Sequence, residues 1–176
     1  MVDRMLRAVK ADVSLYEEVE ANPTYNQEAL TIVGIIAIIS AVAGVGLQVI
    51  LRGGTTGIIT GIWSGVSVFI GYYVWSYLTF FVGTRMFNGT ADVGELQRTL
   101  AYSMSPQVLS FIPIVGIIAS IYSLYLGFIA VRQALDFDNQ KALMTAGIAW
   151  LIWFVISLAI GGVIAALAIG ASAVTG

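Results

Sequence analysis

The sequence contains no cysteine and no histidine. Without cysteine the chain has no disulfide, no thiolate nucleophile and no thiolate metal ligand. Without histidine it lacks the commonest metal ligand and the side chain that ordinarily titrates near neutral pH. The signatures of phosphate-binding loops, zinc hydrolases and serine hydrolases are missing as well. We therefore expect no enzyme, no catalytic residue, no metal and no cofactor.

Charge is also scarce, since 10% of the 176 residues are charged and 59% are hydrophobic. Soluble domains contain about 25% charged residues, so this composition excludes a water-soluble globule. The net charge of −2 gives no electrostatic reason to expect nucleic acid as a partner. The composition instead indicates a protein whose solvent is lipid.

Four stretches of the chain carry no charge at all: 29–51, 53–84, 99–131 and 142–176. Each is longer than the roughly 20 apolar residues that a membrane-spanning helix needs. The alternating polarity that marks a membrane β-strand does not occur in them. The sequence therefore predicts an all-α integral membrane protein.

The third uncharged stretch is long enough for a helical hairpin. Pro113 lies near its middle and would interrupt a continuous helix, so we predict that the chain reverses there. With the amino terminus inside, five spans place seven Lys and Arg residues inside and one outside, whereas four spans give five and three. The predicted fold class is thus a five-transmembrane-helix bundle, with spans at about 29–51, 56–83, 93–112, 114–135 and 142–171.

The expected localisation is a cell membrane that the chain crosses several times, with the amino terminus in the cytoplasm and the carboxyl terminus outside. Residues 1–22 form a cytoplasmic segment before the membrane domain 23–176, and apolar residues at three- and four-residue steps predict an amphipathic helix over 2–20. One interpretation is an interfacial helix, with Arg4, Arg7 and Lys10 near anionic headgroups. The other is a helix that packs on the cytoplasmic loops.

Three helix starts carry capping signals. Thr24 and Gln27 have the spacing of a capping box before the first span, as Asp92 and Glu95 do before the third. The loop 136–139 offers a cap for the fifth span.

Small residues recur at four-residue spacing in three of the spans, which lets another helix backbone approach closely. They serve either packing inside the bundle, which we favour, or formation of a homo-oligomer. The positions predicted to pack are Gly53, Gly57, Gly61, Gly65, Gly116, Gly127, Gly162 and Gly170.

Aromatic residues gather in the second span between Tyr72 and Phe81. They are typical of a belt at the membrane–water interface. The alternative is a wall on which a ligand stacks.

The third span is the most polar. Pro106 should kink it and leave the carbonyl group of Tyr102 without its helical partner. We predict that the most functional part of the bundle is built here, where the side chains either line a polar pocket or cross-link helices. The candidate residues for binding a partner or ligand are Arg98, Tyr102, Ser105, Pro106 and Gln107.

Three parts of the sequence resemble the Yip family of small five-span membrane proteins. They are the run from Phe87 to Tyr102, the segment 105–107 and the pattern Ile112-Pro113-x-x-Gly116. The family takes its name from interaction with Ypt/Rab GTPases. The resemblance continues through the fourth span to residue 142 and implies a five-span fold with a cytoplasmic amino terminus. In eukaryotic members it implies a role in forming vesicles between the endoplasmic reticulum and the Golgi.

Eukaryotic members carry a D-L-Y-G-P motif before the first span, whereas residues 22–28 here read N-P-T-Y-N-Q-E. The chain therefore resembles a prokaryotic-type member of the cytoplasmic membrane. We expect a membrane-organising or trafficking-like scaffold, with membrane lipids and a cytoplasmic protein as partners. The alternative is a transporter or channel for a small neutral molecule or lipid, lined by the third span.

Overall fold

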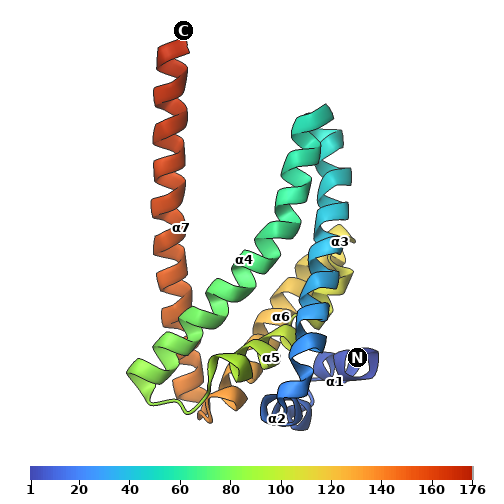
Figure 1. Cartoon of the computed structure of the whole chain (residues 1–176), viewed down its shortest axis with the longest axis vertical. Coiled ribbons are helices and arrows are strands. Elements are labelled where there is room, and N and C mark those ends of the chain that lie inside the picture. The colour runs from blue at the N-terminus through green and yellow to red at the C-terminus, as the bar shows by residue number, and fades with distance from the viewer. Residues whose placement is uncertain (176) are drawn as a thin grey trace.

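The computed structural model describes the backbone of residues 1–175 and the side chains of residues 1–51 and 53–159. Every regular element in this part of the chain is a helix. Figure 1 shows the short helices gathered at one end of the molecule. From that end extend three long helices, α3 (Asn26–Arg52), α4 (Gly54–Phe87) and α7 (Asn139–Thr175).

Within the described residues, four helices are long and apolar enough to cross a membrane. They are α3, α4, α6 (Pro113–Ala134) and the described part of α7. Their outer faces are apolar: Ile38, Ile62 and Ile118 are each more than half exposed. Exposed apolar surface of this extent needs lipid around it, so the chain is a multi-pass membrane protein.

Glycines allow α3 and α4 to pack closely. Gly57, Gly61 and Gly65 are buried on α4. An added Cβ at Gly65 would lie 2.6 Å from the carbonyl oxygen of Ala37, and one at Gly57 or Gly61 would lie at least as close to the α3 backbone. The prediction that Gly53 packs is wrong, because this residue has a φ of 73° at the turn between the helices and nothing lies near its Cβ position.

The predicted span 93–112 is divided in the structure. The helix α5 (Val93–Ser103) is followed by a 3₁₀-helix, η2 (Ser105–Leu109). Pro106 cannot donate a hydrogen bond to the carbonyl oxygen of Tyr102, which accepts one from the Ser105 hydroxyl at 2.6 Å instead. The eleven residues of α5 cover only about 17 Å, less than the roughly 30 Å of a bilayer core. The five-span count is therefore not confirmed.

The chain reversal at Pro113 is confirmed, since α6 begins at that residue and packs on α5 and η2. An added Cβ at Gly116 would lie 2.9 Å from the carbonyl oxygen of Ser110, and one at Gly127 would lie 3.8 Å from the Ser103 hydroxyl. Within this hairpin α2 contacts both α5 and α6, whereas α1 contacts α5 and η2. The tip of the hairpin stops short of the α3–α4 turn (Figure 1). The remaining predicted packing positions, Gly162 and Gly170, lie outside the residues whose side chains are described.

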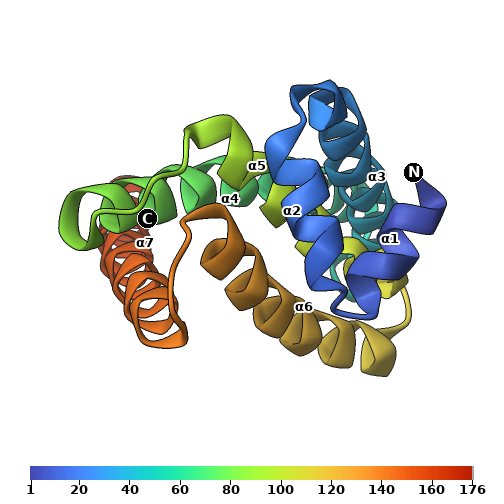
Figure 2. The same ribbon diagram turned by 90° about the horizontal axis from the view of Figure 1, so that it is seen from below.

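The continuous helix predicted over 2–20 is wrong: α1 (Val2–Val9) and α2 (Val13–Ala21) are separate. Ala11 has a φ of 56° between them, and the Asp12 carboxylate accepts a hydrogen bond from the backbone N–H of Ser14 at 3.1 Å to cap α2. Viewed from this end, α2 lies over α5 and α6 (Figure 2). Its packing side is formed by Leu15, Tyr16 and Val19, all fully buried.

The capping predictions have mixed outcomes. The capping box of Asp92 and Glu95 is confirmed, and Asp138 caps α7 by accepting a hydrogen bond from the backbone N–H of Lys141 at 2.8 Å. The box at Thr24 is wrong. Asn22 accepts the hydrogen bond from the Thr24 backbone and starts the 3₁₀-helix η1 (Pro23–Tyr25), after which α3 begins without a side-chain cap.

Candidate functional site

Charged residues collect at one end of the molecule. All of them except Arg52 belong to three segments: 3–28, 85–98 and 132–141. Figure 1 shows these segments together at the end that carries α1 and α2. We call residues 1–28, 85–98 and 132–141 the charged end.

Arg98 joins α5 to the end of α2. Its side chain is only 4% exposed. Its Nε donates a hydrogen bond to the carbonyl oxygen of Val19 at 2.7 Å, and its Nη2 donates one to the carbonyl oxygen of Glu20. Its Nη1 donates to the side-chain oxygen of Asn26 at 2.9 Å. Because unpaired carbonyl groups at a helix end attract cations, Arg98 fixes the carboxyl end of α2 against α5 and α3.

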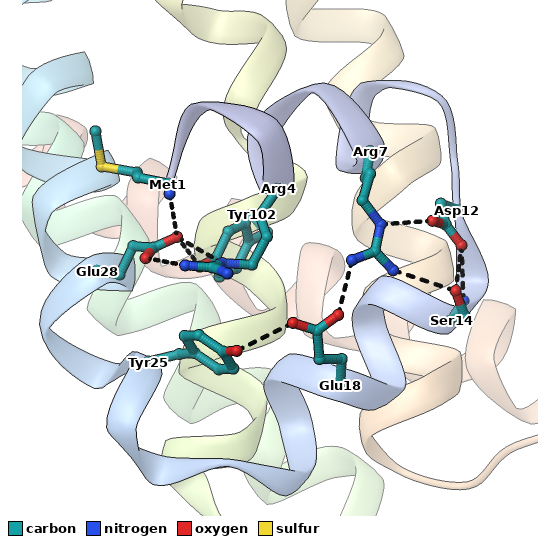
Figure 3. A network of polar contacts seen from close by, with 9 residues as sticks. All are labelled: Met1, Arg4, Arg7, Asp12, Ser14, Glu18, Tyr25, Glu28 and Tyr102. Carbon is teal, nitrogen blue, oxygen red and sulfur yellow. Dashed lines mark hydrogen bonds and ion pairs between the residues drawn. The ribbon is translucent and has the colours of Figure 1, made fainter.

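Glu28 is the centre of a second group of contacts, which Figure 3 shows from close by. The Tyr102 hydroxyl donates a hydrogen bond to Glu28 Oε1 at 2.5 Å, and Arg4 donates two, at 2.9 and 2.5 Å. The amino group of Met1 lies 3.5 Å from the same carboxylate, and the Arg4 guanidinium lies over the Tyr25 ring. These contacts tie α1 and α5 to the start of α3.

Arg7 organises the junction of α1 and α2. It donates hydrogen bonds to Asp12 at 2.8 Å and to Glu18 at 2.7 Å (Figure 3). Hydrogen bonds from Ser14 and Arg7 lower the pKa of Asp12 to about 2. Lys10 is exposed and has no ion pair with any described residue.

The exposed surface of the charged end is acidic. The ion pairs of Arg4 and Arg7 neutralise carboxylates as well as bases, and Arg98 is buried, so the exposed residues decide the charge of this surface. Glu20 adds little negative charge near neutral pH, because burial, and then the charges of Asp136 and Glu95, raise the pKa of its carboxyl to about 7. The exposed acids are Asp3, Glu17, Asp92, Asp136 and Asp138, against the exposed bases Lys10, Arg85 and Lys141.

The structure does not bring the five predicted candidate residues around one pocket. Arg98 and Tyr102 connect helices, and the Ser105 hydroxyl is used by the α5 backbone. Pro106 is buried at the start of η2, and Gln107 lines a cavity between α4, α5, α6 and α7.

That cavity has a volume of about 570 Å³ and lies between α4, α5, α6 and α7. No charged residue is among the described residues that line it. Its polar side chains include Ser67, Ser103, Gln107 and Ser123. The aromatic cluster of α4 is divided, since Tyr72 and Trp75 line the cavity, whereas the outward-facing members Tyr73, Tyr77 and Phe81 are exposed.

Sequence reasoning missed Glu28 and Ser123. The sequence could have predicted an ion pair for Glu28, because this residue is a lone carboxylate directly before a long apolar span and such a charge needs a partner. Ser123 had none, since a serine in an apolar helix ordinarily bonds to its own backbone.

A protein-family model described as the Yip1 domain matches residues 13–161. Comparisons with curated proteins and with solved structures gave no match. The matched region runs from the start of α2 into α7 and includes Arg98, Tyr102, Glu28 and the whole lining of the cavity. The chain belongs to the Yip family of membrane proteins.

Proposed function

We propose that the chain is a non-enzymatic membrane-organising scaffold that binds a protein partner at the charged end. The observation that supports this best is the asymmetry of the molecule. Segments far apart in sequence bring 17 of the 18 charged residues to one end (Figure 1). There Arg98 and Glu28 hold α1 and α2 in a defined position. The surface of the charged end is therefore preformed in the absence of a partner.

The partner that fits this surface is basic. Seven Lys and Arg residues and ten Asp and Glu residues lie at the charged end. Among its exposed charged residues five are acidic and three are basic. Complementary charge steers encounter and suppresses wrong partners. A cytoplasmic segment rich in Lys and Arg is therefore the proposed partner.

The orientation is part of the same proposal. The charged end faces the cytoplasm, because it holds seven of the eight basic residues. The carboxyl terminus then lies on the other side of a cell membrane. Residues 93–134 make a hairpin that enters from the cytoplasmic side, in place of two complete crossings.

Photo-crosslinking tests the scaffold. A photoreactive amino acid is placed at Glu17, Asp92 or Gln140, which are exposed at the charged end, and as a control at Thr55 or Ile59, which are exposed near the α3–α4 turn. We expect the same partner to be captured from all three charged-end positions and from neither control. Capture should weaken as salt is raised, because exposed charges are screened.

Equal capture at both ends, or capture that does not depend on salt, would contradict the scaffold proposal. Repeating the experiment from Gln140 with Asp3→Lys and Glu17→Lys, two exposed acids that cap no helix, separates the acidic surface from the rest of the charged end. Loss of capture in these variants supports a basic partner.

A second candidate function is transport of a small neutral molecule or lipid. The observation that favours it is the uncharged cavity beside Gln107. Flux of a neutral solute into vesicles that contain the purified protein tests it directly. Equal flux with and without the protein would remove this candidate and leave the scaffold untouched.

A further inference from the structure

We propose that the cavity between α4, α5, α6 and α7 binds one molecule of an uncharged single-chain lipid whose polar group is a hydroxyl or a carbonyl. This inference concerns binding alone. It goes beyond the scaffold role and does not require the lipid to be moved across the membrane.

The walls of the cavity suit a lipid chain. They include Trp75, Met104, Phe128 and Trp153, whose large side chains offer apolar contact on several sides. The volume of about 570 Å³ falls within the range of about 300–1,000 Å³ typical of small-molecule sites. A single apolar chain fits a site of this size.

The lining of the cavity includes a hydroxyl group without a partner. Ser123 is 6% exposed, and its Oγ has no hydrogen-bond partner among the described residues. Its neighbour Ser120 donates to the backbone of its own helix at 2.8 Å, as serines in apolar helices commonly do. A buried hydroxyl without a partner costs free energy, so an oxygen atom of a ligand would stabilise it.

Ser103 and Gln107, which lie four residues apart on α5 and η2, line the cavity together with Ser123. Gly127, one helical turn beyond Ser123, brings α6 near α5, since a Cβ there would lie 3.8 Å from the Ser103 hydroxyl. The Ser103 hydroxyl donates to the carbonyl oxygen of Leu100 at 2.7 Å and can still accept a hydrogen bond, whereas the Gln107 amide can donate and accept. They carry no charge, and a buried ionised headgroup without a counter-charge would be strongly disfavoured.

The opening of the cavity points to the bilayer as the source of the ligand. Leu124, Leu143 and Trp150 line the cavity and are also exposed on the outside of the helices. These residues belong to helices long and apolar enough to cross a membrane. A molecule that enters past them comes from among the lipid chains, which favours a lipid over a water-soluble solute.

Two glycines allow the cavity to be filled by mutation. Gly71 and Gly127 line it, and nothing lies within 4 Å of a Cβ built at Gly71. Gly71→Leu and Gly127→Leu therefore place a side chain in the cavity from opposite sides. Gly147→Leu is the matched control, because Gly147 is exposed on α7, does not line the cavity and has open space at its Cβ position.

The probe is oleyl alcohol that carries a photoreactive diazirine in its chain, added to the full chain in vesicles of phosphatidylcholine. We expect saturable labelling with one probe per chain, in peptides that contain Met104 or Phe128. Labelling should fall at least fivefold in Gly71→Leu and Gly127→Leu and stay unchanged in Gly147→Leu. Ser123→Ala should weaken binding about three- to tenfold, which corresponds to one hydrogen bond.

Several results would overturn the inference. Labelling that does not saturate, or that persists in both filled variants, shows ordinary contact with bulk lipid. Equal competition by oleate and by oleyl alcohol would contradict the uncharged polar group, and unchanged affinity in Ser123→Ala would contradict its recognition. A dimer that Gly71→Leu dissociates, together with no labelling, would assign the cavity to a second copy of the chain. None of these results bears on crosslinking at the charged end.

Discussion

At the scale of single residues, Arg98 shows how a charge is accommodated in a chain with few charges. The guanidinium is buried, and its hydrogen-bond partners are two carbonyl groups at the end of α2 and the side chain of Asn26. The partial negative charge of a helix carboxyl end stabilises a cation there. Tyr102, one turn further along α5, reaches Glu28 on α3. Both residues therefore determine where the N-terminal helices sit.

Arg98→Ala should destabilise the protein by about 2–3 kcal/mol, because hydrogen bonds from a charged group to buried acceptors are lost. Thermal unfolding in detergent micelles measures this loss. Arg85→Ala, at an exposed position, should change the unfolding temperature little. A similar loss in both variants would mean that the contacts of Arg98 contribute nothing specific.

Glu20 gives the protein a pH dependence of defined sign. Its carboxyl has a pKa of about 7 in the folded protein, above the ordinary value of 4.5. The folded chain therefore binds more protons than the unfolded chain between these values, and stability falls as the pH rises from 4.5 to about 7.

Glu20→Gln should remove this slope. At pH 8 the variant should be more stable than the parent by about 1 kcal/mol, a value reduced from the full linkage because the side chain is partly solvated. At pH 4 the two proteins should unfold alike. Unfolding temperatures across this range are the measurement, with the exposed Asp3→Asn as control; parallel curves for Glu20→Gln and the parent would refute the assignment.

At the scale of elements, α4 combines two packing modes. Its first half carries glycines that fit against α3, and its second half carries Tyr72, whose hydroxyl donates a hydrogen bond to the carbonyl oxygen of Gln97 on α5 at 2.9 Å. Without a hydrophobic effect between helices in lipid, close backbone contact and hydrogen bonds supply the attraction. The glycine half forms its close contact within one chain, with α3.

Gly61→Leu should separate α3 from α4, because the new side chain would overlap the backbone of Val45. Overpacking costs about 1–3 kcal/mol where side chains can move, and we expect at least that loss against a rigid backbone. Gly46→Leu on α3 has open space and should be tolerated. Thermal unfolding compares the two, and equal stability would show that the close α3–α4 contact is dispensable.

At the scale of the whole molecule, the hairpin of α5, η2 and α6 determines the topology. Its two ends lie at the charged end, and its tip stops short of the α3–α4 turn (Figure 1). A hairpin of this kind returns the chain to the side from which it entered. The proposed orientation of the termini is then the same whether the hairpin crosses the bilayer completely or in part.

Cysteine labelling distinguishes a complete from a partial crossing by the hairpin. Because the sequence contains no cysteine, each introduced cysteine is the only residue that reacts. Glu17→Cys and Gln140→Cys should react with a membrane-impermeant maleimide from one side, and Thr55→Cys from the other. Phe111→Cys, at the tip of the hairpin, should react from neither side, because it ends within the hydrocarbon. Reaction of Phe111→Cys from the side of Thr55 would show five complete spans, and opposite sides for Glu17 and Gln140 would overturn the topology.

The sequence by itself determined the solvent and the class of the protein. Long uncharged stretches can be stable only in lipid as helices, and Pro113 has to end a helix because it lacks an N–H group. The capping box at Asp92 was predictable for a similar reason, since it depends on contacts three residues apart. The resemblance to the Yip family was also visible in local motifs.

Only the tertiary structure decided which groups meet. The break between α1 and α2 at Ala11 is a backbone conformation without a strong local signal. The hydrogen bonds of Arg98 to the end of α2 and of Arg4 to Glu28 join residues that are distant in sequence. The cavity beside Ser123 is a property of four helices at once. Such features depend on how the helices pack against one another, and no local sequence pattern specifies that packing.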